Sequence, residues 1–265
     1  MAQSHAGQQD DHARRVRSAF TAQAVSYSGS ARIADPEGRR AFAAFVAPPA
    51  TALALDIATG PGFVALAFAE RVRRVVAVDL TPAMLARAGA ERGRRDAANL
   101  DLALADAGVL PCADGTFDLI TCGSAFHHFP QPDRILAEMT RVLRPGGLVA
   151  ISDIITSDDS AKAARHNAIE RLRDPSHTRA LPLSELAALS ERCGLRTLRT
   201  ETSRRERALG EWVAISRTPD PVVARVRSLL VEAIDDDVAG IGVWLADDEP
   251  HFWHTTAWYV AQKPE

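Results

Sequence analysis

The sequence predicts an α/β protein with a doubly wound, Rossmann-like sheet, in which parallel strands alternate with helices. An apolar strand ends at Asp56, and a turn containing Gly60 and Gly62 leads from it into an apolar helix. A second apolar strand then ends at Asp79. Glycines at such a turn let backbone N–H groups approach a ligand closely. A carboxylate at the end of the second strand can accept hydrogen bonds from ribose hydroxyls. The unit therefore predicts a nucleoside-containing cofactor.

The segments on either side of this unit continue the pattern. Residues 1–11 are polar and are predicted to be disordered. Helices are expected near residues 12–24 and 36–47, ahead of the first strand. Thr81 and Pro82 indicate the start of another helix, because threonine is a favoured N-cap and proline fits the first helical turn.

In the second half of the chain, a continuous apolar run at residues 148–152 predicts a strand that is buried on both faces. Residues 183–193 indicate a helix, residues 195–202 indicate a strand, and residues 253–261 predict a last strand. We therefore expect one domain over residues 12–265. Three accessory segments are expected: an N-terminal helical cover (12–47) and two helical lid insertions (156–180 and 205–248).

Charge distinguishes between two possible cofactors. Residues 60–65 also match the dinucleotide pattern G-x-G-x-x-G/A, so NAD is a competing interpretation. Asp56 precedes the glycine turn, where a carboxylate would repel a pyrophosphate and attract an ammonium group. Asp106 ends a third short strand and could accept a hydrogen bond from an adenine amino group. Together with Asp79, these carboxylates favour a cationic ligand such as S-adenosylmethionine (SAM).

Five blocks of sequence, taken in order, resemble the class I SAM-dependent methyltransferases of methyltransferase type 11. Within that group they are similar to the branch that includes the ubiquinone and menaquinone C-methyltransferases. The blocks are residues 55–62, 78–85, 105–107, 117–129 and 141–147. The resemblance covers roughly residues 20–155. It implies a seven-stranded sheet with the last strand antiparallel, helical lid elements, and S-adenosylhomocysteine as the product formed from SAM. Ala58 departs from the pattern, since many relatives have glycine there, and alanine fits if its φ is negative.

The motif and the resemblance together give a set of cofactor-binding candidates. They are Tyr27, Asp56, Ala58, Thr59, Gly60, Gly62, Asp79, Leu80, Met84, Asp106, Ala107 and Ser124. Asp79 is expected to bind the ribose, and Asp106 and Ala107 to lie near the adenine. Ser124 is expected to line the floor under the sulphonium, with an ordinary loop serine as the alternative. Tyr27 is expected to close over the cofactor, with packing of an N-terminal helix as the alternative.

His127 and His128 are the catalytic candidates. They follow the fourth strand, at the edge of the sheet where ligands bind, and either ring could take a proton from an acceptor. The alternative is that they only hydrogen-bond the backbone. His127 is preferred, because His128 precedes Phe129 and could be tied into the loop. Residues 173–177 are expected to form a substrate wall, with His177 as the next candidate base.

The expected reaction is in-line methyl transfer from SAM to a small molecule. The acceptor would be an O-, C- or N-nucleophile of an aromatic or polyketide-like metabolite, and the sequence does not identify it. Two alternatives stay open. One is an NAD-dependent oxidoreductase, and the other is a protein of this fold that binds SAM but catalyses a different reaction such as cyclisation.

Composition argues against several other classes of protein. A net charge of −3 gives no reason to expect a nucleic-acid partner. No apolar run is long enough to span a bilayer, and residues 1–12 lack the apolar core of a signal peptide, so no membrane partner and a cytoplasmic location are expected. Cys112, Cys122 and Cys193 form neither a metal motif nor a disulfide framework, and no metal is expected. The oligomeric state is left open.

Overall fold

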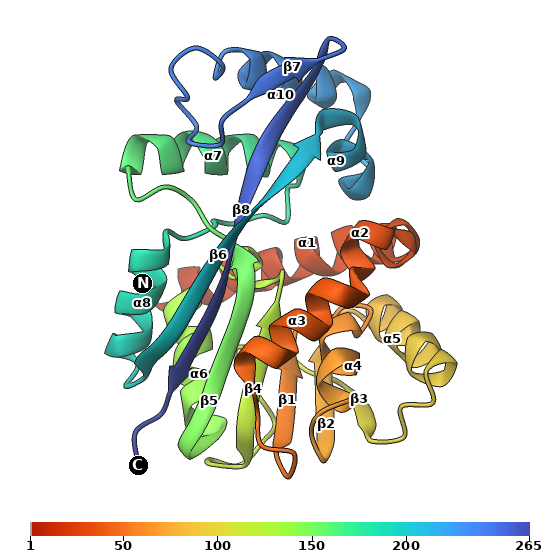
Figure 1. The fold of residues 1–265 in the computed structure, drawn as a ribbon, viewed down its shortest axis with the longest axis vertical. Coiled ribbons are helices and arrows are strands. Elements are labelled where there is room, and N and C mark those ends of the chain that lie inside the picture. The colour runs from red at the N-terminus through yellow and green to blue at the C-terminus, as the bar shows by residue number, and fades with distance from the viewer. Residues whose placement is uncertain (1) are drawn as a thin grey trace.

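Eight strands form one sheet in the computed structural model, which describes residues 2–265, with the backbone alone for residues 2–10. The strands are β1 (Leu53–Ile57), β2 (Arg74–Asp79), β3 (Leu100–Leu104), β4 (Phe117–Gly123), β5 (Leu143–Ile154), β6 (Arg196–Ala208), β7 (Trp244–Ala246) and β8 (Glu249–Gln262). Their order is β3-β2-β1-β4-β5-β8-β6, and β7 pairs with β8 (Figure 1). The strands from β1 to β5 pair in parallel, whereas β8 runs antiparallel to β5 and β6. The predicted fold class is confirmed, and the short β7 accounts for the additional strand.

Helices cover both faces of the sheet. The helices of the described residues are α1 (Ala2–Gly29), α2 (Ala31–Ala34), α3 (Pro36–Val46), α4 (Phe63–Ala69), α5 (Pro82–Arg94), the 3₁₀ turn η1 (Phe126–His128), α6 (Pro132–Val142), α7 (Ser160–Arg173), α8 (Leu183–Arg192), α9 (Leu209–Ser216) and α10 (Asp220–Val231). Leu55 and Ile57 of β1 belong to an apolar core shared with α6 and α8, and Ala54 belongs to a core shared with α3 and α4. Because neighbouring strand residues point to opposite faces, these contacts bury β1 on both sides.

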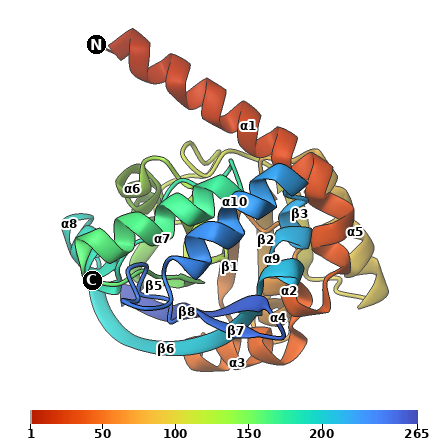
Figure 2. The same ribbon diagram turned by 90° about the horizontal axis from the view of Figure 1, so that it is seen from above.

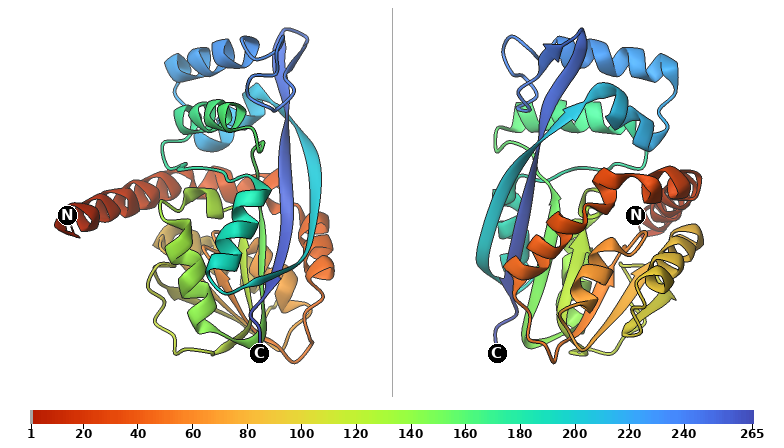
Figure 3. Two further views of the ribbon diagram at one scale, coloured as in Figure 1. Left: turned by 90° about the vertical axis from the view of Figure 1, so that its left-hand side faces the viewer. Right: turned by 45° about the vertical axis from the view of Figure 1, so that its right-hand side comes forward.

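A separate group of helices lies beyond the carboxyl ends of the parallel strands, where β6 and β8 extend as a long antiparallel pair (Figures 1 and 3). We call this group the outer lobe: α7, α9, α10, β7 and the adjoining ends of β6 and β8. Its apolar cluster includes Ile169, Trp212, Leu230 and Phe252. Residues 205–248, expected to be mainly helical, contain α9 and α10 but also the end of β6 and all of β7.

The helix α1 is longer than the sequence predicts. Its backbone is helical from Ala2, whereas disorder is predicted for residues 1–11; Met1 lies outside the described residues. No proline interrupts residues 2–29, and several alanines and glutamines there are good helix formers. The helix runs between the sheet and the outer lobe, and its first part projects from the body of the molecule (Figures 2 and 3). Among the described helices, none combines the length and the apolar content needed to cross a membrane.

Candidate active site

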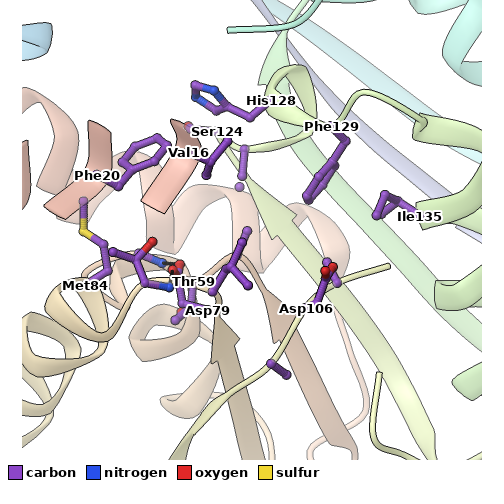
Figure 4. A pocket seen from close by; sticks show the side chains of 18 of the residues that line it. Val16, Phe20, Thr59, Asp79, Met84, Asp106, Ser124, His128, Phe129 and Ile135 are labelled. Atoms are coloured by element: carbon purple, nitrogen blue, oxygen red, sulfur yellow. Dashed lines mark hydrogen bonds between the residues drawn. The ribbon is translucent and has the colours of Figure 1, made fainter. Parts of the chain in front are cut away.

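A cavity of about 370 Å³ lies at the carboxyl ends of β1 to β4, beneath α1 (Figure 4). Small-molecule and cofactor sites typically enclose about 300–1,000 Å³. Of the twelve predicted cofactor-binding residues, ten line this cavity: Tyr27, Ala58, Thr59, Gly60, Asp79, Leu80, Met84, Asp106, Ala107 and Ser124. Parallel strands end at the same edge of a sheet, which is why residues from four separate strand ends meet here.

The glycine turn between β1 and α4 follows a left-handed path. Ala58, Gly60 and Gly62 have φ values of 50°, 54° and 83°. The expectation that Ala58 has a negative φ is therefore wrong, and its conformation costs about 1–2 kcal/mol for a residue with a Cβ. Two hydrogen bonds hold the turn in place: Thr59 N donates to Val78 O (3.0 Å), and Gly62 N donates to Thr59 O (2.9 Å). This conformation lets the chain turn from a strand into a helix within a few residues.

Two of the predicted cofactor residues, Asp56 and Gly62, do not line the cavity. Asp56 is 1% exposed and accepts hydrogen bonds from Thr59 Oγ1 (2.6 Å) and Thr121 Oγ1 (2.5 Å). Burial raises the pKa of Asp56 to about 6. A Cβ on Gly62 would lie 3.1 Å from the Cβ of Ala88, so glycine at this position lets the turn pack against α5.

The carboxylates at the other strand ends face the cavity (Figure 4). Asp79 Oδ2 accepts a hydrogen bond from Gly60 N (2.8 Å), and its Oδ1 accepts one from Thr81 N (2.8 Å). Asp79 thereby joins the end of β2 to the glycine turn. Each carboxylate oxygen has a second acceptor position, so this residue can still bind two hydroxyl groups. Asp106 Oδ1 accepts from Gly108 N (2.7 Å), which orders the loop after β3.

Arg39 also lines the cavity, and the sequence reasoning did not identify it. Its guanidinium donates to Ile33 O (3.3 Å), while its buried Nε has no hydrogen-bond partner among the described residues. Burial lowers the pKa of this guanidinium. A signal was present in the sequence: Arg39 precedes Phe42, Ala43 and Val46 by three, four and seven residues, so it shares the buried face of α3.

The wall opposite the glycine turn comes from α1 and from the loop after β4. Phe20 packs edge-on against Tyr27 and His128, with ring centroids 5.9 and 5.0 Å apart. Burial raises the pKa of Tyr27. Ser124 lines the cavity in a left-handed conformation with a φ of 54°, and its N donates to Ser152 O (2.7 Å). These four side chains come from two regions far apart in sequence, α1 and the loop after β4, and none lies in the two expected lid insertions.

The two adjacent histidines differ in their access to the cavity. His128 lines the cavity, whereas His127, the preferred candidate base, does not. His127 Nδ1 lies 2.6 Å from Asp153 Oδ1. Burial acts to lower the pKa of His127, but the charge of Asp153 and this hydrogen bond outweigh burial, and the pKa is raised. Asp153 therefore stabilises the protonated form of His127.

His128 has one ring nitrogen committed and the other available. Its Nδ1 lies 2.9 Å from the carbonyl oxygen of Ser176, and a carbonyl can only accept. Nδ1 therefore carries the proton, and Nε2 of the neutral ring keeps its lone pair. Burial, followed by the charge of the nearby His127, lowers the pKa of His128 to about 4. The ring is neutral at physiological pH.

His177 is not positioned to act on a ligand in the cavity, and residues 173–177 do not form the expected substrate wall. Its Nε2 lies 2.9 Å from Asn167 Oδ1, an atom that also accepts from Ala180 N (2.7 Å). That oxygen is an acceptor, so His177 Nε2 donates to it. Neither residues 156–180 nor residues 205–248 contribute a cavity-lining residue in the described part of the chain.

One cluster outside the cavity has the composition of a metal site: His166, Glu170 and His254, whose ligand atoms lie within 4.8 Å of one another. Two arginines adjoin it. Arg173 forms an ion pair with Glu170 (3.1 Å), and Arg207 Nε donates to His254 Nδ1 (3.4 Å). The proton of neutral His254 is then on Nε2, which faces Glu170. These charges favour a buried network of ion pairs over a bound cation.

The comparisons with known proteins agree with this geometry. Residues 55–151 match the family model described as a methyltransferase domain. The uncharacterized protein YafE of Escherichia coli is 30% identical over 159 residues, which are 60% of this chain and 77% of YafE. The chain belongs to the class I SAM-dependent methyltransferases. The uncharacterized methyltransferase YcgJ of Bacillus subtilis is 36% identical over 135 residues, covering 51% of this chain and 53% of YcgJ.

A demethylmenaquinone methyltransferase of Thermus thermophilus is 41% identical over 101 residues, covering 37% of this chain and 44% of that protein. These matches link the chain to the branch that its sequence blocks resemble. This methyltransferase chain spans only about half the length of YcgJ. A crystal structure of a putative methyltransferase from Bacillus halodurans has a TM-score of 0.83 and 26% identity, and covers 86% of this chain and 100% of that one. The fold therefore matches over most of the chain, beyond the residues that the family model covers.

Proposed function

We propose that the protein transfers a methyl group from SAM to a small-molecule acceptor and releases S-adenosylhomocysteine. One observation carries the proposal: a single cavity joins the carboxylate-tipped strand ends to a neutral histidine whose Nε2 is available. The first feature suits a cationic nucleoside, and the second suits removal of a proton from an acceptor. The NAD interpretation is not favoured, because the carboxylates beside the glycine turn would repel a pyrophosphate.

The residues of the cavity fit SAM in sign and in hydrogen-bonding capacity. Asp79 has acceptor positions for both ribose hydroxyls, and Asp106 and Ala107 offer a site for the adenine. Arg39 has a buried, unpartnered Nε that suits the carboxylate of the methionine part. Asp56 contributes negative charge from behind the turn and orients Thr59. Neutral His128 avoids placing a second cation beside a sulphonium.

When bound, SAM supplies a methyl carbon that its sulphonium makes electrophilic. The protein's part is to hold an acceptor in line with that carbon and to keep water away, and Phe20 and Tyr27 close the cavity from α1. His128 Nε2 accepts the proton of an acceptor hydroxyl, amine or acidic carbon. Because Val16, Phe20 and Phe129 line this side, we infer an aromatic or polyketide-like acceptor without a strong charge. We also propose that residues 12–265 act as one SAM-binding unit; a cytoplasmic location stays a prediction.

Calorimetry tests the cofactor. SAM and S-adenosylhomocysteine should bind, and NADH should not. Asp79→Ala should weaken binding of S-adenosylhomocysteine by more than about tenfold, because it removes charged acceptors for two hydroxyls. Asp101→Ala is the matched control, since Asp101 lies on the neighbouring strand β3, pairs with Arg74 and does not line the cavity. Equal affinity in both variants would contradict the proposed ribose site.

Mass spectrometry tests the reaction. Phenols, quinols, amines and enolisable ketones are incubated with the protein and SAM, and a methylated acceptor should form together with an equal amount of S-adenosylhomocysteine. Conversion of an acceptor without S-adenosylhomocysteine would instead support the alternative in which SAM is bound but its methyl group is not used.

A further inference from the structure

We propose that residues 174–178, the segment between α7 and α8, fix the tautomer and orientation of His128, with Asp174 and Ser176 as positioning residues. The relevance of this to catalysis rests on the proposed role of His128 as a base. The segment belongs to the first expected lid insertion, yet it does not line the cavity. Its role is to support the histidine from behind.

Two oxygen atoms of Ser176 face the same ring nitrogen. The carbonyl oxygen lies 2.9 Å from His128 Nδ1, and Oγ lies 3.3 Å from it. Ser176 Oγ donates its own proton to Asp174 Oδ1 (2.6 Å), so it presents a lone pair to the histidine. Both oxygens are acceptors, and both therefore require the proton on Nδ1. In the other tautomer, Nε2 would carry the proton and could not take one from an acceptor.

The sequence Asp-Pro-Ser-His explains why the segment adopts this shape. His177 N donates to Asp174 O (3.0 Å), which closes a turn with aspartate at its first position and proline at its second. Asp174 is 4% exposed, and its Oδ1 accepts from Ser176 N (2.9 Å) as well as from Ser176 Oγ. One buried carboxylate oxygen thus sets the direction of the Ser176 backbone and side chain.

The segment is also attached to the backbone of the histidine loop. The N–H groups of Thr178 and Arg179 both donate to His127 O (3.0 Å each), and Thr178 Oγ1 donates to His128 O (3.0 Å). His12 Nε2 of α1 lies 2.8 Å from this same carbonyl oxygen. The helix over the cavity, the histidine loop and the insertion therefore meet at a single backbone group.

The titratable and charged groups around His128 come from every element that packs against it. They are His127 of η1, Asp153 of β5, Arg173 at the end of α7, Asp174 and His177 of the segment, and His12 of α1. The rings of His127 and His128 are 4.2 Å apart. A change in the segment would thus change both the tautomer of His128 and its response to pH.

Nitrogen-15 NMR of the histidine rings in the full chain tests the proposal directly, because the two tautomers differ in the shifts of Nδ1 and Nε2. The His128 signals are assigned from their loss in His128→Gln. We expect the wild-type ring to carry its proton on Nδ1. Asp174→Ala should convert it to a mixture or to the Nε2-protonated form, lower kcat by about tenfold or more, and leave SAM affinity within about twofold.

Asp159→Ala is the matched control. Asp159 caps the other end of α7, where its Oδ1 accepts from the N–H groups of Ala161 and Lys162, and it does not touch the histidines. Loss of this cap should destabilise the insertion about as much as Asp174→Ala does. The His128 tautomer and the pH profile of kcat should stay unchanged. Asp174→Asn keeps an oxygen acceptor and should preserve the wild-type tautomer. If Asp174→Ala does not fold, Ser176→Ala serves in its place. It should shift part of the His128 population to the Nε2-protonated form.

An Nε2-protonated His128 in the wild-type protein would overturn the proposal, whatever the enzyme does with SAM. A tautomer that is unchanged in Asp174→Ala and Ser176→Ala would remove the positioning role. A change of the His128 tautomer of equal size in Asp159→Ala would show that the change results from a general loss of stability. None of these NMR results depends on an acceptor, so failure of the proposed function would be seen separately, as absent SAM binding or absent product.

Discussion

Two groups of buried histidines use the same residue types for different purposes. At the cavity, His127 and His128 lie beside Asp153, and in the outer lobe His166 and His254 lie beside Glu170. Both groups are almost without solvent contact. At the cavity, however, one ring lines an open space and keeps a nitrogen lone pair available. In the outer lobe, the ligand atoms of the two histidines and the carboxylate lie within 4.8 Å of one another, and none of these residues lines the cavity.

The charge around each group explains this difference. At the cavity, Asp153 pairs with His127 and stabilises its protonated form, whereas the pKa of His128 is lowered to about 4 and this ring is neutral. In the outer lobe, Glu170 is fully buried between Arg173, His166 and His254, and its pKa is lowered by these partners although burial opposes the shift. A buried carboxylate surrounded by cationic and hydrogen-bonding partners joins structural elements, here α7 and β8. Composition alone therefore does not identify a site; access and net charge do.

The comparison fails first if the two groups contribute equally to turnover. His128→Gln should lower turnover by about 10²–10⁴-fold with little change in SAM affinity, because it removes the proton acceptor. His254→Gln should leave the turnover per folded molecule near the wild-type value. Both are measured by steady-state kinetics with the acceptor found by mass spectrometry. Near-normal turnover in His128→Gln would mean that the reaction depends on positioning alone.

For the free energy of unfolding, the outer-lobe group should matter more than the cavity group. Glu170→Ala should lower the free energy of unfolding by about 3–5 kcal/mol, because it removes the shorter ion pair of buried Arg173 (3.1 Å) and leaves that side chain with the longer, 3.9 Å ion pair to Asp174. Glu232→Ala is the control: Glu232 pairs with Arg165 on the surface of the same lobe, and its loss should cost less than about 1 kcal/mol. Urea unfolding measures both. Equal effects would show that burial of Glu170 has no special importance.

The sequence predicts those parts of the site that are encoded locally. The glycine turn, Asp79 and Asp106 follow directly from strand ends, and Gly60, Asp79 and Asp106 line the cavity. Which of two adjacent histidines faces the cavity depends on the rotation of a short 3₁₀ turn, and no spacing reveals that. The tautomer of His128 depends on Ser176, a residue 48 positions away, so it follows only from the packing of the insertion against the loop.

The fold shows the same limit. The doubly wound sheet follows from the sequence, and the antiparallel last strand follows from the resemblance of the sequence blocks, whereas the length of β6 and β8 depends on their mutual pairing into the outer lobe. The left-handed Ala58 is a similar case. Its residue type argues for a negative φ, and the hydrogen bonds of the turn override that preference.

The dependence of stability on pH should separate the two groups by a smaller effect. The pKa of His254 is lowered to about 4, first by burial, so the folded state resists a proton that the unfolded chain accepts near pH 6.5. Stability is therefore lost as pH falls from 6.5 toward 4, by about 1–3 kcal/mol for this residue. At the cavity, the lowered pKa of His128 acts in the same direction over this range, whereas the raised pKa of His127 gives stability that is fully present below pH 6.5 and is lost as pH rises above it. The stability that Glu170 contributes is lost only at lower pH than this, because its pKa is lowered from 4.5.

Urea unfolding at a series of pH values checks this sign. The free energy of unfolding of the wild-type protein should decrease between pH 6.5 and 4, and His254→Gln should reduce that decrease. His127→Gln should leave that decrease nearly unchanged and should instead remove a loss of stability above pH 6.5, because the stability that comes from a raised pKa is already present below 6.5. A His254→Gln variant with the full wild-type pH dependence would place the acid-sensitive group elsewhere, and His177, whose pKa is lowered to about 2 mainly by burial, would be tested next.

Added metal should have the smallest effect, because we expect no metal ion to bind in the outer lobe. A cation at His166, Glu170 and His254 would need the lone pair of His254 Nε2, but Arg207 donates to Nδ1 and so leaves the proton on Nε2. Zinc added to the metal-free protein should therefore not raise the Tm. A rise that is lost in His166→Gln, but kept in the control His251→Gln on the surface end of β8, would show that the outer lobe holds a metal site. The two arginines would then have to move away from the cluster on binding, and the contrast with the cavity would rest on ligand type instead of access.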